Sequence, residues 1–141
     1  MPASAADISL PVEPESVATL ARWLEARADG LGLAGTTREA LRLCAEEAAT
    51  NIVRHAYPDG VRQARFLARI ESNGEVTLAF DDDGIPFDPT RYVDDAQAGE
   101  IEDARIGGVG IRLIRGFASG IRYERVGTIN RLVLAFERPA A

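Results

Sequence analysis

Two parts of this chain have the alternating apolar pattern of paired strands joined by a tight, glycine-containing turn. Residues 64–71 and 75–81 flank Asn73-Gly74, and residues 121–126 and 129–136 flank Gly127-Thr128. Strands joined by such two-residue turns are antiparallel neighbours. The sequence therefore predicts a mostly antiparallel sheet that contains two hairpins.

Two helical patterns precede the first hairpin. Apolar residues recur every three or four positions over residues 17–28 and again over residues 40–57, which predicts two amphipathic helices. Thr36 and Glu39 have the spacing of a capping box, in which each side chain bonds a backbone N–H of the first turn. We therefore expect the second helix to begin at Thr36.

The remaining segments complete the expected architecture. Alternation over residues 8–12 predicts an opening edge strand, residues 85–107 read as a long irregular loop, and residues 111–117 as a short helix. The order strand, helix, helix, hairpin, loop, helix, hairpin predicts an α+β two-layer sandwich with its helices on one face of the sheet. A length of 141 residues predicts one domain over residues 1–141.

Composition restricts the kind of partner. The formal net charge of −6 argues against nucleic acid as a direct partner, because phosphate backbones are bound by Lys and Arg. The apolar runs are too short to span a membrane, and residues 1–6 resemble no export signal, so we expect a cytoplasmic protein. The lone cysteine, Cys44, lies on an apolar helical stripe and is expected to fill core space.

Glu47 and Asn51 are four positions apart on the second predicted helix and so lie on one face of it. A carboxylate there can orient or deprotonate an attacking hydroxyl group, and the carboxamide oxygen can ligate Mg²⁺. Taken alone, such a pair usually belongs to a solvated helix surface.

The second candidate motif, Asp82-Asp83-Gly84-Ile85-Pro86-Phe87-Asp88-Pro89, begins where a predicted strand ends. Three successive acids, residues 81–83, repel one another, so at least one of them is expected to meet a hydrogen-bond donor. The amino group of an adenine base is such a donor. A polar strand terminus followed by a turn remains the alternative.

The third motif, Gly107-Gly108-Val109-Gly110, immediately precedes the short predicted helix. Backbone N–H groups at a helix N-terminus favour phosphate, although glycines here could also be plain loop residues. A Rossmann dinucleotide site is excluded, because Leu113 stands where the third glycine is required and an acidic loop stands where a strand is required.

The three motifs, in this order, resemble the GHKL (histidine kinase-like) ATPases. Glu47-Ala-Ala-Thr-Asn51, the Asp-Asp-Gly-Ile-Pro-Phe-Asp-Pro segment and Gly-Gly-Val-Gly-Ile-Arg-Leu-Ile are similar to those of the anti-sigma serine kinases of the RsbW and SpoIIAB type. The resemblance covers nearly the whole chain, including residues 128–132, which are similar to the last strand of the family. It implies the Bergerat ATP-binding fold.

The resemblance also implies roles for individual residues. Glu47 would be the general base toward a serine hydroxyl, and Asn51 the protein ligand to Mg²⁺. Asp82 would accept a hydrogen bond from the adenine amino group, and Gly84 would let the backbone approach the base. His55, one turn beyond Asn51, would either belong to the nucleotide site or pack at the helix end.

Toward the phosphates, the resemblance implies that Gly108, Val109 and Gly110 contact the ATP, with residues 85–107 as a lid. Arg105, just before these glycines, could reach a phosphate oxygen or could be a solvated lid residue. The implied cofactors are thus ATP and Mg²⁺.

The resemblance implies an ATP-dependent protein serine kinase that phosphorylates an anti-anti-sigma (STAS-like) protein, sequesters a sigma factor, and could form a homodimer. A stressosome-type switch kinase and a non-catalytic ATP-binding regulatory module are the alternatives. The catalytic domain of a histidine kinase is disfavoured, because it requires a phosphoacceptor histidine on a dimerisation helix. The single histidine, His55, instead lies in the nucleotide-site helix.

Overall fold

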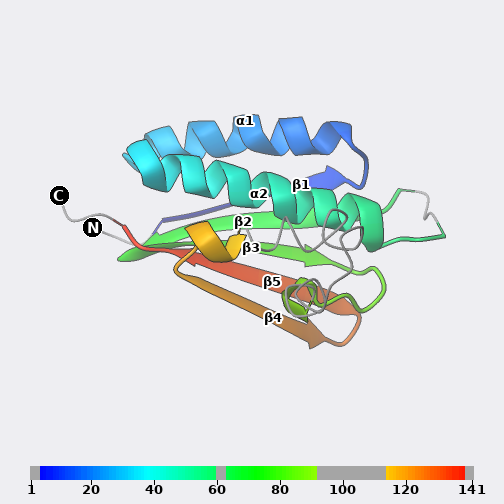
Figure 1. The fold of residues 1–141 in the computed structure, drawn as a ribbon. Coiled ribbons are helices and arrows are strands. Elements are labelled where there is room, and N and C mark those ends of the chain that lie inside the picture. The colour runs from blue at the N-terminus through cyan, green and yellow to red at the C-terminus, as the bar shows by residue number, and fades with distance from the viewer. Residues whose placement is uncertain (1–3, 60–62, 92–113, 139–141) are drawn as a thin grey trace.

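The computed structural model describes residues 4–59, 63–91 and 114–138. Five antiparallel strands form one sheet in the order β1-β2-β3-β5-β4, and helices α1 and α2 lie together over one face of it (Figure 1). The elements are β1 (Ser4–Pro11), α1 (Glu15–Gly30), α2 (Gly35–His55), β2 (Arg65–Asn73), β3 (Glu75–Asp82), the 3-10 turn η1 (Pro89–Arg91), β4 (Gly120–Val126) and β5 (Ile129–Phe136). The predicted α+β two-layer architecture is confirmed, with β1 at an edge of the sheet.

The core lies between the sheet and the two helices. Successive side chains of a strand point to opposite faces, so alternate residues of each central strand turn toward the helices. The buried members are Phe66, Ala68 and Ile70 of β2, Val76, Leu78 and Phe80 of β3, and Leu132, Leu134 and Phe136 of β5. Burying a large apolar side chain contributes about 1.5–3 kcal/mol, so this face provides most of the stabilisation of the sheet.

Helix α1 buries Leu20, Leu24 and Ala28 against this core. It ends at a glycine turn in which Gly32 has a φ of +69° and the N–H of Leu33 donates to the carbonyl of Ala28 at 2.9 Å. This is the Schellman arrangement, which satisfies carbonyls left open at a helix end.

Among the described residues, neither α1 nor α2 combines the length and the apolar composition that a membrane-spanning helix requires.

The predicted capping box is wrong. Helix α2 begins at Gly35, and its N-cap is Ala34, whose side chain has no oxygen and makes no cap hydrogen bond. Thr36 therefore lies within the first turn, and Glu39 instead forms an ion pair with Arg42 further along the same helix. The N-cap lies at Ala34, two residues earlier than the capping-box spacing indicates.

The two hairpin turns differ from each other. Val126 pairs with Ile129, so the predicted two-residue turn at Gly127-Thr128 is confirmed. In the first hairpin, Asn73 itself pairs with Glu75, and the turn is centred on Gly74 alone, with a φ of +85°. The observed turn is therefore one residue shorter than the two-residue turn predicted there.

A close contact joins the end of β3 to the end of α2. The N–H of Ile85 donates to the carbonyl of Ala56, the C-cap of α2, at 2.9 Å. A Cβ atom added at Gly84 would lie 2.2 Å from the Ala56 carbonyl oxygen and 2.7 Å from its Cβ. Only glycine lets these two segments approach so closely.

We expect Gly84→Ala to lower the free energy of unfolding by about 2–3 kcal/mol, because the added methyl group meets backbone that cannot yield without moving α2. Gly30→Ala is the matched control, since a Cβ there meets nothing within 4 Å and alanine favours a helix. Urea denaturation of both variants measures the difference. Equal stabilities for the two would contradict the contact.

Candidate functional site

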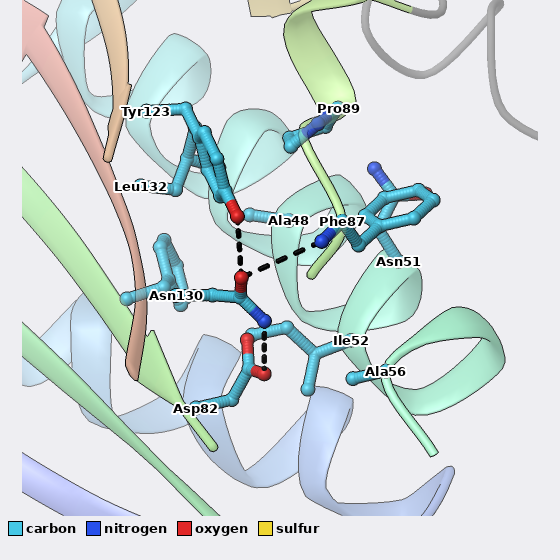
Figure 2. Close-up of a pocket in the computed structure, with 11 residues that line it drawn as sticks. Ala48, Asn51, Ile52, Ala56, Asp82, Phe87, Pro89, Tyr123, Asn130 and Leu132 are labelled. Atoms are coloured by element: carbon cyan, nitrogen blue, oxygen red, sulfur yellow. Dashed lines mark hydrogen bonds between the residues drawn. The ribbon is translucent and has the colours of Figure 1, made fainter. Parts of the chain in front are cut away.

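A cavity opens between α2 and the ends of the central strands (Figure 2). Residues from α2, β3, β4, β5 and the segment after β3 line it: Ala48, Asn51, Ile52, Ala56, Phe80, Asp82, Phe87, Pro89, Tyr123, Asn130 and Leu132. Asn51 and Asp82, which come from two separate sequence motifs, both line this cavity. The fold thus brings together the helix motif and the strand-end motif.

Asp82 is the last residue of β3, and its carboxylate is buried beside the cavity. Its Oδ1 atom accepts hydrogen bonds from the N–H of Gly84 and from the Nδ2 of Asn130, both at 2.9 Å. Burial raises the pKa of Asp82, and the two hydrogen bonds oppose that rise by favouring the ionised form. The site therefore holds a partly desolvated acceptor whose Oδ1 is already engaged.

The two neighbouring acids have separate partners. Asp81, on the opposite face of the sheet, accepts two hydrogen bonds from Arg131, at 2.8 and 2.9 Å. Asp83 accepts a hydrogen bond from the Tyr57 hydroxyl at 2.6 Å, and burial together with Asp83 raises the pKa of Tyr57. The expectation that the acidic run meets donors is confirmed, and all three acids find them within the protein.

Asn130 of β5 is a residue that the sequence analysis missed. Its side chain is buried and takes part in five hydrogen bonds that reach three other segments. The Nδ2 atom donates to Asp82 Oδ1 at 2.9 Å and to the Ile85 carbonyl at 2.8 Å, whereas Oδ1 accepts from the Tyr123 hydroxyl, from Arg125 at 3.1 Å and from the Phe87 N–H at 3.4 Å. One feature of the sequence could have identified Asn130: it is a polar residue two positions before Leu132, and so on the inward face of an otherwise apolar strand.

Asn51 is buried on α2, with 6% of its surface exposed. Its Nδ2 atom has no hydrogen-bond partner among the residues that the structure describes. A buried amide without a partner costs about 1–3 kcal/mol, which makes Asn51 a candidate to bind a ligand in the cavity. An oxygen and an N–H₂ group at this point suit a hydrated Mg²⁺ ion and phosphate oxygens.

Two further residues of α2 were candidates for the site. Glu47 lies one turn before Asn51, is half-buried and is absent from the cavity lining. Cys44, on the same helix, is fully buried and is a core residue, as predicted. Burial and the charge of Glu47 raise the pKa of its thiol to about 12. His55 ends the helix and stacks on Phe87, with ring centroids 5.0 Å apart, so it contacts a residue that lines the cavity.

Part of the predicted site lies outside the described residues. This applies to Gly108, Val109, Gly110 and Arg105, and to residues 92–107 of the predicted lid. The start of that lid is described: residues 85–88 have no regular secondary structure, and η1 follows. Gly84 is next to the cavity-lining Ala56, and its lack of a side chain is required by that contact.

Comparison with known proteins identifies the family of this chain. The family model of the histidine kinase-like ATPase domain matches residues 10–136. The serine/threonine-protein kinase BtrW of Bordetella bronchiseptica is 38% identical over 112 residues, which are 79% of this chain and 79% of BtrW.

A solved structure has the same fold. The RsbU and RsbW domains of Rv1364c from Mycobacterium tuberculosis superpose with a TM-score of 0.66 at 16% identity, covering 97% of this chain. This chain spans 34% of that longer one, and at 16% identity the similarity shows the fold alone. Because the family model matches almost the whole chain, the chain belongs to the histidine kinase-like ATPase domain family.

Proposed function

We propose that this protein binds ATP with Mg²⁺ in the cavity between α2 and the sheet and transfers the γ-phosphoryl group to a serine of a partner protein. The observation that carries the proposal is the buried Asn51 amide, which lacks a partner among the described residues and lines the same cavity as Asp82. The match to a histidine kinase-like ATPase domain supports ATP as the ligand.

Asp82 recognises the base in this proposal. Its Oδ1 atom is engaged by Gly84 and Asn130, so Oδ2 remains to accept a hydrogen bond from the adenine amino group. The apolar side chains of Ile52, Phe87 and Leu132 line the cavity and would cover the faces of a planar base.

Asn51 would hold the metal. Magnesium prefers oxygen ligands and keeps several waters, so one protein oxygen beside the phosphates is a sufficient anchor. When bound, the metal would neutralise charge that develops on the transferring phosphoryl group. Gly108, Val109, Gly110 and Arg105 would complete the phosphate site.

Glu47 would act on the acceptor serine. Its carboxylate would take the proton of the serine hydroxyl as Oγ forms a bond to the γ-phosphorus, and the bond from that phosphorus to the bridging oxygen of ADP breaks. The 38% identity to a protein named as a serine/threonine kinase supports a phosphotransferase. Serine as the acceptor follows from the RsbW-type resemblance.

The proposed partners are an anti-anti-sigma (STAS-like) protein as the substrate and a sigma factor that is held inactive. A cytoplasmic location and a homodimer belong to the same proposal. The fold match to a chain that carries RsbU and RsbW domains is in keeping with a protein that regulates other proteins. A stressosome-type switch kinase would phosphorylate a STAS protein without binding a sigma factor, so co-purification of a sigma factor separates the two.

The decisive test supplies candidate STAS proteins with γ-labelled ATP and Mg²⁺. We expect label on a serine of one of them. Glu47→Gln should lower the transfer rate about 100-fold or more while ATP affinity stays within about 2-fold, because a general base contributes to chemistry and not to nucleotide binding. ATP binding without transfer to any candidate would favour the non-catalytic module.

Asn51→Ala should weaken Mg-ATP binding about 10-fold or more, because the proposed protein ligand to the metal is removed. The same change should not lower the free energy of unfolding, since it removes a buried amide whose Nδ2 makes no hydrogen bond to the described residues. Titration calorimetry with and without Mg²⁺, beside urea denaturation, measures both effects. Unchanged affinity would remove Asn51 from the metal site.

Asp82→Asn should weaken ATP binding by about 1–3 kcal/mol. The new carboxamide oxygen can still accept from Gly84 and Asn130, but its N–H₂ group then faces the adenine amino group, so two donors oppose each other. Because burial raises the pKa of Asp82, loss of this charge should leave the fold intact. If affinities for ATP and GTP both stayed at the wild-type values, Asp82 would be a structural residue only.

A further inference from the structure

We propose that Asn130 is the positioning residue that sets the base specificity of this cavity. It occupies one oxygen of Asp82 and so presents only the other to the base, which selects a purine with an amino group at position 6 over one with an oxo group there. This inference rests on the proposed nucleotide binding and adds to it a residue outside the three sequence motifs.

The orientation of the Asn130 carboxamide is determined by its neighbours. Its oxygen faces three donors, of which the Arg125 guanidinium and the Phe87 N–H cannot act as acceptors. Its nitrogen faces two acceptors, the Asp82 carboxylate and the Ile85 carbonyl. A rotation by half a turn would set donors against donors and acceptors against acceptors, so the nitrogen must point at Asp82.

The contact between Asn130 and Asp82 follows from the sheet. The two residues are directly paired across β3 and β5, and both side chains are on the buried face. Figure 2 shows Asn130 between the Tyr123 hydroxyl and the Asp82 carboxylate, at the wall of the cavity. A rigid backbone ladder therefore sets the distance between them.

The hydrogen bonds around Asn130 control what Asp82 can do. Asn130 and the Gly84 N–H both donate to Oδ1. These hydrogen bonds favour the ionised carboxylate, which acts only as an acceptor, and so oppose the effect of burial on the pKa of Asp82. Arg125, which bonds both Asn130 at 3.1 Å and the Gly84 carbonyl at 2.8 Å, adds a positive charge on the same side. An ionised acceptor pairs with a 6-amino group and repels a 6-oxo group.

Without Asn130, Asp82 would lose this restriction. A carboxyl group that is buried and lacks the amide donor takes up a proton more readily, and a protonated carboxyl can donate to a 6-oxo group. The side chain could also rotate. Base selectivity, rather than nucleotide binding as a whole, is thus the property that depends on Asn130.

The test compares binding of ATP and inosine triphosphate, which differ in the amino and oxo groups at position 6, by titration calorimetry of the full chain with Mg²⁺. For the wild type we expect ATP to bind about 10-fold tighter or more. Asn130→Leu, of similar size, should reduce this ratio about 10-fold, mainly through weaker ATP binding. Tyr123→Phe removes one donor to Asn130 and should reduce the ratio by a few-fold, which keeps the test available if Asn130→Leu does not fold.

Ser72→Ala is the control, since Ser72 is also buried and polar but pairs with Val76 at the far end of β3, and we expect it to keep the wild-type ratio. A folded Asn130→Leu variant that keeps the ratio, or that weakens both nucleotides equally, would overturn the inference. So would a wild type that binds both nucleotides equally, with the proposed ATP binding left standing. A wild type that binds neither would overturn the proposed function and this inference together.

Discussion

The contact between Gly84 and Ala56 determines where the cavity lies. It brings the end of β3 against the end of α2 with no side chain between them, and the Ile85 N–H to Ala56 carbonyl bond holds them there. Asp82 lies two residues before this point on the strand, and Asn51 lies just over one turn before it on the helix. Residues at those two positions both line the cavity, so the motifs meet because the backbones touch.

The polar groups of this cavity work against stability. The Asn51 amide is buried with one atom unpaired among the described residues, and Asp82 is a carboxylate with a pKa raised by burial. Each costs free energy that the apolar face of β2, β3 and β5 has to offset. Polar groups placed in this way are typical of binding sites, since a ligand that pairs them recovers the cost only when it is bound.

Sequence patterns were sufficient for the layers and for part of the site. Periods of 2 and of 3.6 residues depend only on which side chains face the core, and they predicted the strands and helices. Asn51 and Asp82 stood out because each belongs to a short local motif. Asn130 did not, because its partner is fixed by the pairing of β3 with β5, strands far apart in the chain. The predicted cap at Thr36 failed for a related reason, since the Thr36–Glu39 spacing does not reveal where the backbone enters the helix.

The described end of the cavity is held together by hydrogen bonds within the protein. Asn130 and Arg125 bond to the backbone at Gly84, Ile85 and Phe87, so the first residues after β3 are tied to β4 and β5. The stack of His55 on Phe87 ties them to α2 as well. A base that bound here would contact side chains already held in place by these interactions, so ordering the protein would cost little binding free energy. A smaller ordering cost on binding explains why residues 85–88, which have no regular secondary structure, contact both the sheet and α2.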